Sequence, residues 1–478
     1  MKSQAFNPFL PSWEYIPDGE PHLFGGRVWL YGSHDKFGGK TWCENDYVAW
    51  SAPENDLSDW RFEGVIYRKE QDPENPKGTR CMYAPDVAEK RGRYFLYYTL
   101  DHMIGTVSVA VADTPNGPFR YYGKVRYPSG RIAGGDPGDL YNFDPSVFID
   151  TDGKAYLYSG FCTRPVEQKM YDERGMQYGL YCYPLREDML TIAGEPSLLI
   201  PMGAALESSS FCGHGFHEGS SMRKFGNTYY LIWSSQNRNE LCYATSFRPD
   251  GGFEYRGVLV SNGDVGIGGI TEETCRNFMG NNHGSLIEVG GKRYIFYHRQ
   301  TNRHSFSRQA CAEEIFVAKD GSMRQAEMTS CGLNGGPLAG KGEYPARIAC
   351  NLWRGKGGKY YDADVDLEGE PYFTQSGEDR EGEADQYIAN MRSGATAGYK
   401  YFDLRATNGI SITVRGRAEG VVDVLTEDGG SPVCTISLSL QGEEKTLGTP
   451  MHTGSGKDAL YLRFRGEGSI DLLAFSLY

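Results

Sequence analysis

Residues 144–159 read DPSVFIDTDGKAYLYS, and this stretch decides the fold. Two short runs of aliphatic and aromatic residues flank the turn sequence DTDG, which is typical of two antiparallel β-strands joined by a tight turn. The second half of the stretch, a turn glycine followed by aromatic and aliphatic residues, recurs along the chain. Its copies begin at Gly26, Gly92, Gly153, Gly226 and Gly291.

The spacing of these copies predicts a radial array of small sheets. Successive copies start roughly 65 residues apart, which is long enough for a unit of several strands. Further strand-like runs, such as VSVAVAD and LCYATSF, lie between them, and the chain lacks long helical periodicity. We therefore expect an all-β protein whose first domain, residues 1–335, is a five-bladed β-propeller.

The chain changes character after the fifth copy. Residues 332–345, GLNGGPLAGKGEYP, are rich in glycine and proline and have the composition of a linker. Short strand-like runs follow at regular spacing, among them YKYFDL, GISITVRG and ALYLRFRG. This pattern predicts a β-sandwich over residues 346–478.

The composition limits the classes of function. Of the 478 residues 39% are hydrophobic and 13% aromatic, so the chain can form a core. A net charge of −13 disfavours binding to nucleic acid or to an anionic membrane, and no apolar run reaches the roughly 18 residues of a membrane span. The N-terminus lacks the features of a secretory signal, and the 11 cysteines form no CxxC pair, which predicts a cytoplasmic protein with reduced thiols. The oligomeric state stays open.

Acidic residues stand at matching places before the repeat copies. Asp18, Asp144 and Glu218 precede the first glycine of their copies by 8, 9 and 8 residues, and Asp86 does so by 6. Because a propeller gathers equivalent ends of its blades around one axis, we expect these carboxyl groups to meet in one pocket. Crowded carboxyl groups split their pKa values, so that one keeps a proton while another is ionised, as hydrolysis of a glycosidic bond requires. Aspartates that only cap turns would give the same spacing.

The phrases around these acids carry a family resemblance. IPDGEPHLFGGRVWL, DPSVFIDTDGKAYL and EGSSMRKFGNTYYLIWSS resemble the family 43 glycoside hydrolases over residues 5 to about 335. The resemblance implies a five-bladed propeller with an inverting mechanism. It further implies that Asp18 is the general base, that Glu218 is the general acid, and that Asp144 tunes and orients the acid. Many members carry Asp-Pro at the base position, whereas this chain reads DGEP from Asp18, so Glu20 is a rival for the base.

Further residues are expected near the sugar or the axis. The resemblance places His283, in GNNHGSL, at the axis, where some relatives hold a cation or water, with a hydrogen-bonded core histidine as the alternative. It also implies that Arg308 lines the pocket. Trp13 and Trp42 stand in loop-like contexts, where they stack on a sugar ring or pack within a blade. Asp86 is either a structural blade acid or a ligand of a sugar hydroxyl.

The expected activity is the release of a terminal sugar from a small plant-type oligosaccharide or glycoside. The resemblance implies an α-L-arabinofuranosidase first, and then a β-xylosidase or a β-galactofuranosidase. It implies no required cofactor, and it leaves open a structural calcium ion at the axis with His283 as a ligand. A non-catalytic sugar-binding propeller is the alternative from another class. The phrase DQYIANMRSGATAGYKYFDL resembles family 6 carbohydrate-binding modules, so the C-terminal domain either binds polysaccharide or supports the propeller.

Overall fold

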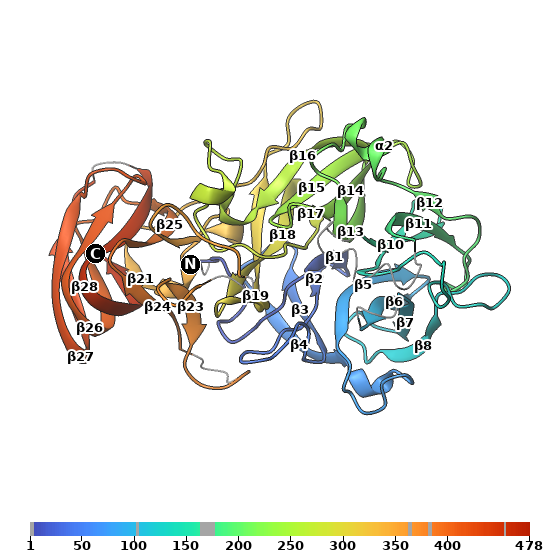
Figure 1. The fold of residues 1–478 in the computed structure, drawn as a ribbon, viewed down its shortest axis with the longest axis horizontal. Helices are drawn as coiled ribbons and strands as arrows, with labels where there is room; N and C mark the ends of the chain where they lie inside the picture. The colour runs from blue at the N-terminus through green and yellow to red at the C-terminus, as the bar shows by residue number, and fades with distance from the viewer. Residues whose placement is uncertain (1–3, 102–104, 163–176, 362–365, 381–384, 454–455) are drawn as a thin grey trace.

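A computed structural model describes residues 4–101, 105–162, 177–361, 366–380, 385–453 and 456–478. In Figure 1 the blue-to-yellow part of the chain forms a propeller, and the orange-to-red C-terminal part forms a sheet-rich region beside it. None of the described helices is long and apolar enough to cross a membrane. The predicted all-β fold, with a five-bladed propeller before a sheet-rich region, is confirmed.

The blades are small antiparallel sheets whose strands follow one another in chain order. The first two blades contain β1 (Glu20–Phe24), β2 (Arg27–Tyr31), β3 (Tyr47–Pro53) and β4 (Arg61–Tyr67), then β5 (Met82–Lys90), β6 (Arg93–Leu100), β7 (Val107–Ala112) and β8 (Arg120–Lys124). The third and fourth contain β9 (Ser146–Ile149), β10 (Ala155–Phe161), β11 (Gly179–Leu185) and β12 (Ser197–Leu198), then β13 (Phe216–Phe225), β14 (Thr228–Ser235), β15 (Glu240–Ser246) and β16 (Glu254–Ser261). The fifth contains β17 (Leu286–Val289), β18 (Lys292–Thr301) and β19 (His304–Ile315). Short helical segments lie in the connections, at η1 (Lys69–Gln71), α2 (Ala204–Glu207), η2 (Asn262–Asp264) and η3 (Glu272–Thr274).

The glycine-led copies form the second strand of each blade, as β2, β6, β10, β14 and β18. At the turn before β2, Gly25 and Gly26 have φ angles of +57° and +74°, which glycine adopts without steric strain. The first strands of neighbouring blades lie close together. For example, the backbone N–H of Val147 in β9 donates a hydrogen bond to Asp86 in β5 at 2.8 Å. Residues just before the first strands are therefore brought to one end of the axis.

Backbone contacts close the ring between the first and fifth blades. Gly19, directly before β1, forms a parallel bridge with Gly284, shortly before β17. A Cβ on Gly284 would lie 1.9 Å from the carbonyl oxygen of Phe296, so this approach requires glycine. The segment before β1 runs beside β19, where the side chain of Asn7 exchanges two hydrogen bonds of 3.0 Å with the backbone of Ala312.

Apolar side chains fill the space between neighbouring blades. Leu30 and Trp50 of the first blade share one buried cluster with Phe296 and Ala312 of the fifth. Burial of this kind contributes about 25 cal/mol for each Å² of apolar surface removed from water, and it fixes the blades against one another. All 11 cysteines are free.

The C-terminal strands form one hydrogen-bonded network with its own apolar core. Its elements are η4 (Gly332–Asn334), β20 (Leu338–Ala339), β21 (Gly342–Pro345), η5 (Ala346–Ile348), β22 (Asn351–Arg354), β23 (Tyr372–Gln375), β24 (Gln386–Arg392), β25 (Ala395–Asp403), β26 (Gly409–Leu425), β27 (Cys434–Pro450) and β28 (Lys457–Leu477). The long strands β26 and β28 pair antiparallel over most of their length.

The glycine-rich segment after the propeller belongs to this second network. β20 pairs with β25 and β21 pairs with β28, although both short strands lie in the predicted linker. A Cβ on Gly340 would lie 2.0 Å from the carbonyl oxygen of Asp403, so glycine permits the close packing there. The domain limits 1–335 and 346–478 stay predictions.

Candidate active site

Asp18 lies two residues before β1, at the end of the axis, and it is almost fully buried. Its φ angle of +57° is in the left-handed region, which aspartate tolerates better than most residues. Its carboxylate accepts a hydrogen bond of 3.0 Å from Nη1 of Arg308 in β19. Burial alone would raise the pKa of Asp18, but neighbouring positive charge, above all that of the Arg308 guanidinium, outweighs it and holds the pKa below its ordinary value. Asp18 is therefore ionised at neutral pH.

Asp144 and Glu218 form the second part of the cluster. Asp144 lies shortly before β9 with a φ angle of +44°, and Glu218 lies in β13 between two irregularities of the strand pairing. Burial raises the pKa of Asp144 well above its ordinary value, and the negative charges of Glu218 and Asp18 raise it further. Asp144 therefore keeps a proton under conditions in which Asp18 has lost its own. The Glu218 side chain is 13% exposed, compared with 6% for Asp18 and 7% for Asp144.

His283 lies between Asp18 and Asp144. Its Nδ1 is 3.8 Å from Asp18 Oδ1 and 3.7 Å from Asp144 Oδ2. Its ring packs on Gly219, where a Cβ would come within 2.8 Å of the imidazole. Gly219 directly follows Glu218 and has a φ angle of +66°, so the glycine lets the His283 ring pack against the backbone next to the glutamate.

A second histidine, His298 in β18, supports the backbone of Asp18. Its Nδ1 accepts a hydrogen bond from the Asp18 N–H at 3.3 Å, and its Nε2 is 2.8 Å from the carbonyl oxygen of Asn281. These partners assign the proton to Nε2. Burial, followed by the charge of Arg308, lowers the pKa of His298 to about 3, so this ring is neutral.

Asp35 fixes the guanidinium of Arg308. Nε and Nη2 of Arg308 donate to the two carboxylate oxygens of Asp35 at 2.8 and 3.0 Å, an arrangement that is both charge-assisted and directional. Asp35 is fully buried, and it also accepts a hydrogen bond from the backbone N–H of Cys43 at 3.0 Å. The predicted position of Arg308 beside the cluster thus depends on the loop between β2 and β3.

Glu20 and Asp86 are held by partners other than Arg308. Glu20 Oε2 accepts hydrogen bonds from Arg223 at 2.6 Å and from Ser221 at 2.9 Å. Asp86 is fully buried, with one oxygen 2.6 Å from His22 Nε2 and the other bonded to the backbone N–H of Val147. Of its two expected roles, Asp86 fits the structural blade acid, because both of its oxygens are already engaged.

The two tryptophans lie in different surroundings. Trp13 packs against Trp50 and Phe62 of the first blade, with centroid distances of 5.8 and 6.5 Å, which matches the packing alternative. Trp42 donates a hydrogen bond of 2.8 Å to the carbonyl oxygen of Ser305, and it directly precedes Cys43 beside the guanidinium of Arg308. Of the two, Trp42 is the one whose sequence neighbour contacts the guanidinium of Arg308.

The described side chains provide a poor calcium site at the axis. Glu20, His22 and Asp86 have ligand atoms within 4.8 Å of one another, and Glu20 Oε1 is buried without a hydrogen-bond partner among the described residues. His283 Nε2 is 4.0 Å from that oxygen. Calcium prefers about six to eight oxygen ligands. The hydrogen bond between His22 and Asp86 already engages one carboxylate oxygen, and the positive charge of Arg223 beside Glu20 repels a cation, so both features disfavour calcium binding. Calcium at this position stays a prediction, and no chemical step depends on it.

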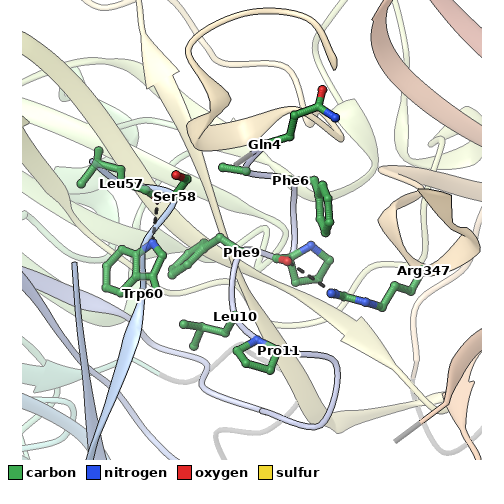
Figure 2. A pocket seen from close by; sticks show the side chains of 11 residues that line it. Gln4, Phe6, Phe9, Leu10, Pro11, Leu57, Ser58, Trp60 and Arg347 are labelled. Atoms are coloured by element: carbon green, nitrogen blue, oxygen red, sulfur yellow. Dashed lines mark hydrogen bonds between the residues drawn. The ribbon is translucent and has the colours of Figure 1, made fainter. Parts of the chain in front are cut away.

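A surface pocket and a second group of potential metal ligands lie apart from the predicted site residues. Figure 2 shows a surface pocket lined by the N-terminal residues Phe6 and Phe9 together with Trp60 and Arg347, and none of the predicted site residues contributes to its lining. His214, Glu240 and Cys242 have potential metal ligands within 4.8 Å of one another. In that group His214 Nδ1 is already 2.7 Å from Glu240 Oε1, which also accepts from Ser235.

His298 and Asp35 belong to the site, although neither is among the predicted residues. His298 lies seven residues after Gly291. The same offset from Gly26 leads to Ser33, whose side chain is also a neighbour of the Asp18 carboxylate, so the register of the repeats carries a signal for His298. The contact of Asp35 with Arg308 joins residues 273 positions apart, and no local pattern indicates it.

A five-bladed propeller that brings together an ionised aspartate, a protonated aspartate and a glutamate at one end of its axis has the framework of a glycoside hydrolase. The chain belongs to the glycosyl hydrolases family 43, because the sequence model of that family matches residues 49–323. The family membership favours the enzyme over the alternative of a non-catalytic sugar-binding propeller.

Individual relatives agree with this assignment. The chain is 48% identical to a xylosidase/arabinosidase from Thermoclostridium stercorarium, over 100% of this chain and 99% of the relative. A xylosidase/arabinosidase from Bacteroides ovatus is 28% identical over 61% of this chain and 87% of its own length. Among solved structures, an arabinoxylan arabinofuranohydrolase from Bacillus subtilis has a TM-score of 0.53 at 20% identity, covering 98% of this chain and 97% of the other. This last similarity concerns the fold alone.

Proposed function

We propose that the protein is an inverting exo-glycosidase that releases terminal α-L-arabinofuranose from small plant-type oligosaccharides, with β-D-xylosides as the second substrate class. The proposal of two sugars is supported by the relative that is 48% identical over the whole chain and is named a xylosidase/arabinosidase. Release of β-D-galactofuranose is the third possibility from the range of the family.

The observation that carries the proposal is the opposite protonation of two neighbouring aspartates. The pKa of Asp18 is lowered and that of Asp144 is raised within one cluster, so the site holds a base and a proton at the same pH. Asp18, held by Arg308, removes a proton from the water that attacks the anomeric carbon.

Glu218 donates a proton to the glycosidic oxygen on the opposite side of the sugar. It is the most exposed of the three acids, as a group that touches the leaving sugar must be. The negative charge of Glu218 helps to raise the pKa of Asp144, so the two side chains are neighbours, and Asp144 is the residue that tunes and orients the acid. Glu20 is engaged by Arg223 and Ser221, which supports Asp18 as the base.

Leaving-group dependence tests the role of Glu218. Wild type and Glu218→Gln are compared on nitrophenyl α-L-arabinofuranoside and on an arabino-oligosaccharide, with β-D-xyloside and β-D-galactofuranoside counterparts. Loss of a general acid reduces the rate by about 10²–10⁴-fold on the oligosaccharide, and by much less on the nitrophenyl glycoside, whose leaving group needs little protonation. Equal losses on both substrates, or no loss on either, would show that Glu218 is not the acid.

A further inference from the structure

A segment of the C-terminal region contacts the loop that positions Asp35. This segment, residues 375–380, begins at the last residue of β23 and lies against the loop between β2 and β3, residues 32–46. The same loop carries Asp35 and Trp42. The C-terminal region therefore reaches the part of the propeller that holds the guanidinium of Arg308.

Asp379 makes the central contact. Its Oδ1 accepts a hydrogen bond from the backbone N–H of Phe37 at 2.7 Å, and its Oδ2 accepts from Asn45 Nδ2 at 3.0 Å. Asn45 Nδ2 also donates to the carbonyl oxygen of Asp35 at 3.0 Å. One carboxylate thus joins Phe37 to Asn45 within the loop, and through Asn45 it reaches the backbone of Asp35.

Two neighbouring contacts anchor the segment on the propeller. Tyr15 donates a hydrogen bond to Gln375 Oε1 at 2.7 Å, and the backbone carbonyl of Tyr15 accepts from the N–H of Asp35 at 3.0 Å. Arg380 Nη1 lies 2.8 Å from the carboxylate of Glu14, which is fully buried. The segment therefore binds on both sides of Asp379 and cannot shift without breaking buried polar contacts.

We propose that Asp379 is a positioning residue for catalysis, and that it acts through the β2–β3 loop on Asp35, Arg308 and Asp18. The path consists of the contacts given above and ends on the hydrogen bond between Arg308 and Asp18. This inference rests on the proposed role of Asp18 as the base. It assigns the C-terminal region a part in the chemistry besides support of the propeller.

Another contact between the two regions supplies a matched control. Arg276, in the connection after β16, pairs with Asp428 at 2.6 Å. Asp428 contacts Arg276, which lies outside the β2–β3 loop, so Asp428→Ala removes a contact between the regions and leaves that loop unchanged. Asp379→Ala likewise removes an aspartate carboxylate that joins the two regions, here at the loop.

The first experiment compares kcat and KM of Asp379→Ala, Asp379→Asn and Asp428→Ala well below their unfolding temperatures. Asp379→Ala is expected to lower kcat by about 5- to 100-fold, because a small misplacement of a catalytic group has effects of this size. Asp379→Asn keeps an acceptor for Phe37 and is expected to retain more activity than the alanine variant. Asp428→Ala should keep the wild-type kcat. Equal kcat in wild type and Asp379→Ala, or an equal loss in Asp428→Ala, would overturn the inference.

A double-mutant cycle tests the path. Asn45→Ala breaks the next link, so the effects of Asp379→Ala and Asn45→Ala on kcat should not add, and the double variant should resemble the more impaired single variant. Fully additive losses would mean that Asp379 acts through another route.

Amide hydrogen exchange tests whether Asp379 orders the β2–β3 loop, and this measurement does not depend on enzyme activity. In Asp379→Ala, but not in Asp428→Ala, amide exchange over residues 35–45 should be faster than in wild type, and unchanged exchange would overturn the inference. If wild type cleaves no glycoside, the proposed function fails, and the exchange measurement still decides whether Asp379 orders this loop.

Discussion

Arg308 Nη1 donates a hydrogen bond of 3.0 Å to Asp18 Oδ1 in a part of the propeller where both side chains are buried. The rest of the guanidinium is held by Asp35, so the positive charge has a fixed place beside the carboxylate. This contact keeps Asp18 ionised despite its burial, and it distinguishes Asp18 from the neighbouring Asp144.

Removal of the charge on Arg308 should shift the pH dependence of catalysis. In Arg308→Gln the pKa of Asp18 rises, so more of the base is protonated at a given acid pH. The acid limb of the kcat/KM profile should then move to higher pH by roughly 1–3 units. Arg308→Lys keeps the charge and should stay closer to wild type. A profile for Arg308→Gln that coincides with wild type would contradict the assignment of Asp18 as the base.

Gly219 should be sensitive to a single added methyl group. In Gly219→Ala the Cβ would meet the His283 ring at 2.8 Å, and we expect kcat to fall by about tenfold or more. Gly226→Ala is the matched control, because its φ angle of +61° is similar and nothing lies within 4 Å of its Cβ. Both variants should lose about 1–3 kcal/mol of stability from backbone strain, and only Gly219→Ala should lose activity in addition. Equal kcat in the two variants would show that the contact with His283 is unimportant.

Asp144 should destabilise the fold at neutral pH. Its native pKa is raised, so its favourable contribution is present below the ordinary pKa of aspartate and is lost as the pH rises through the native value. Asp144→Asn removes this loss. The variant should therefore gain more than about 1 kcal/mol over wild type at pH 8, with little gain at pH 4.

Unfolding by urea at both pH values measures this difference. Asp113→Asn, at an aspartate whose side chain is 73% exposed, controls for the loss of one negative charge. A gain for Asp144→Asn that is the same at pH 4 and pH 8 would refute the raised pKa.

Trp42 and Trp13 should respond differently to truncation. Trp42→Ala removes an aromatic ring from the loop that holds Arg308, so we expect KM to rise by about 2- to 13-fold, the range of a lost stacking contact of about 0.5–1.5 kcal/mol. Trp13→Ala removes packing against Trp50 and Phe62, and it should lower the unfolding temperature with KM unchanged. A higher KM for Trp13→Ala than for Trp42→Ala would reverse the assignment of the subsite.

The propeller and its main acids follow from short-range patterns. The offset of Asp18, Asp144 and Glu218 from the repeat glycines fixes their positions, because each lies near the first strand of its blade. The same logic reaches His298, whose offset matches that of Ser33. Local sequence therefore predicts which strand ends meet at the axis.

Other parts of the site depend on contacts between distant segments. Arg308 and Asp35 are 273 residues apart, and Asp379 contacts Phe37 across 342 residues. Neither pair has a spacing that a repeat could indicate. The glycine-rich residues 332–345 illustrate the same limit, because composition suggests a linker while strand pairing, which involves partners far along the chain, places β20 and β21 in the second network.

The most direct test of the central claim compares kcat/KM for Asp18→Asn and Glu20→Gln on the nitrophenyl glycoside that the wild-type enzyme cleaves best. Asp18→Asn should lose about 10²–10⁴-fold, whereas Glu20→Gln, which keeps an acceptor for Arg223, should stay within about tenfold of wild type. Both variants should unfold cooperatively. A larger loss in Glu20→Gln, with near wild-type activity in Asp18→Asn, would contradict Asp18 as the base.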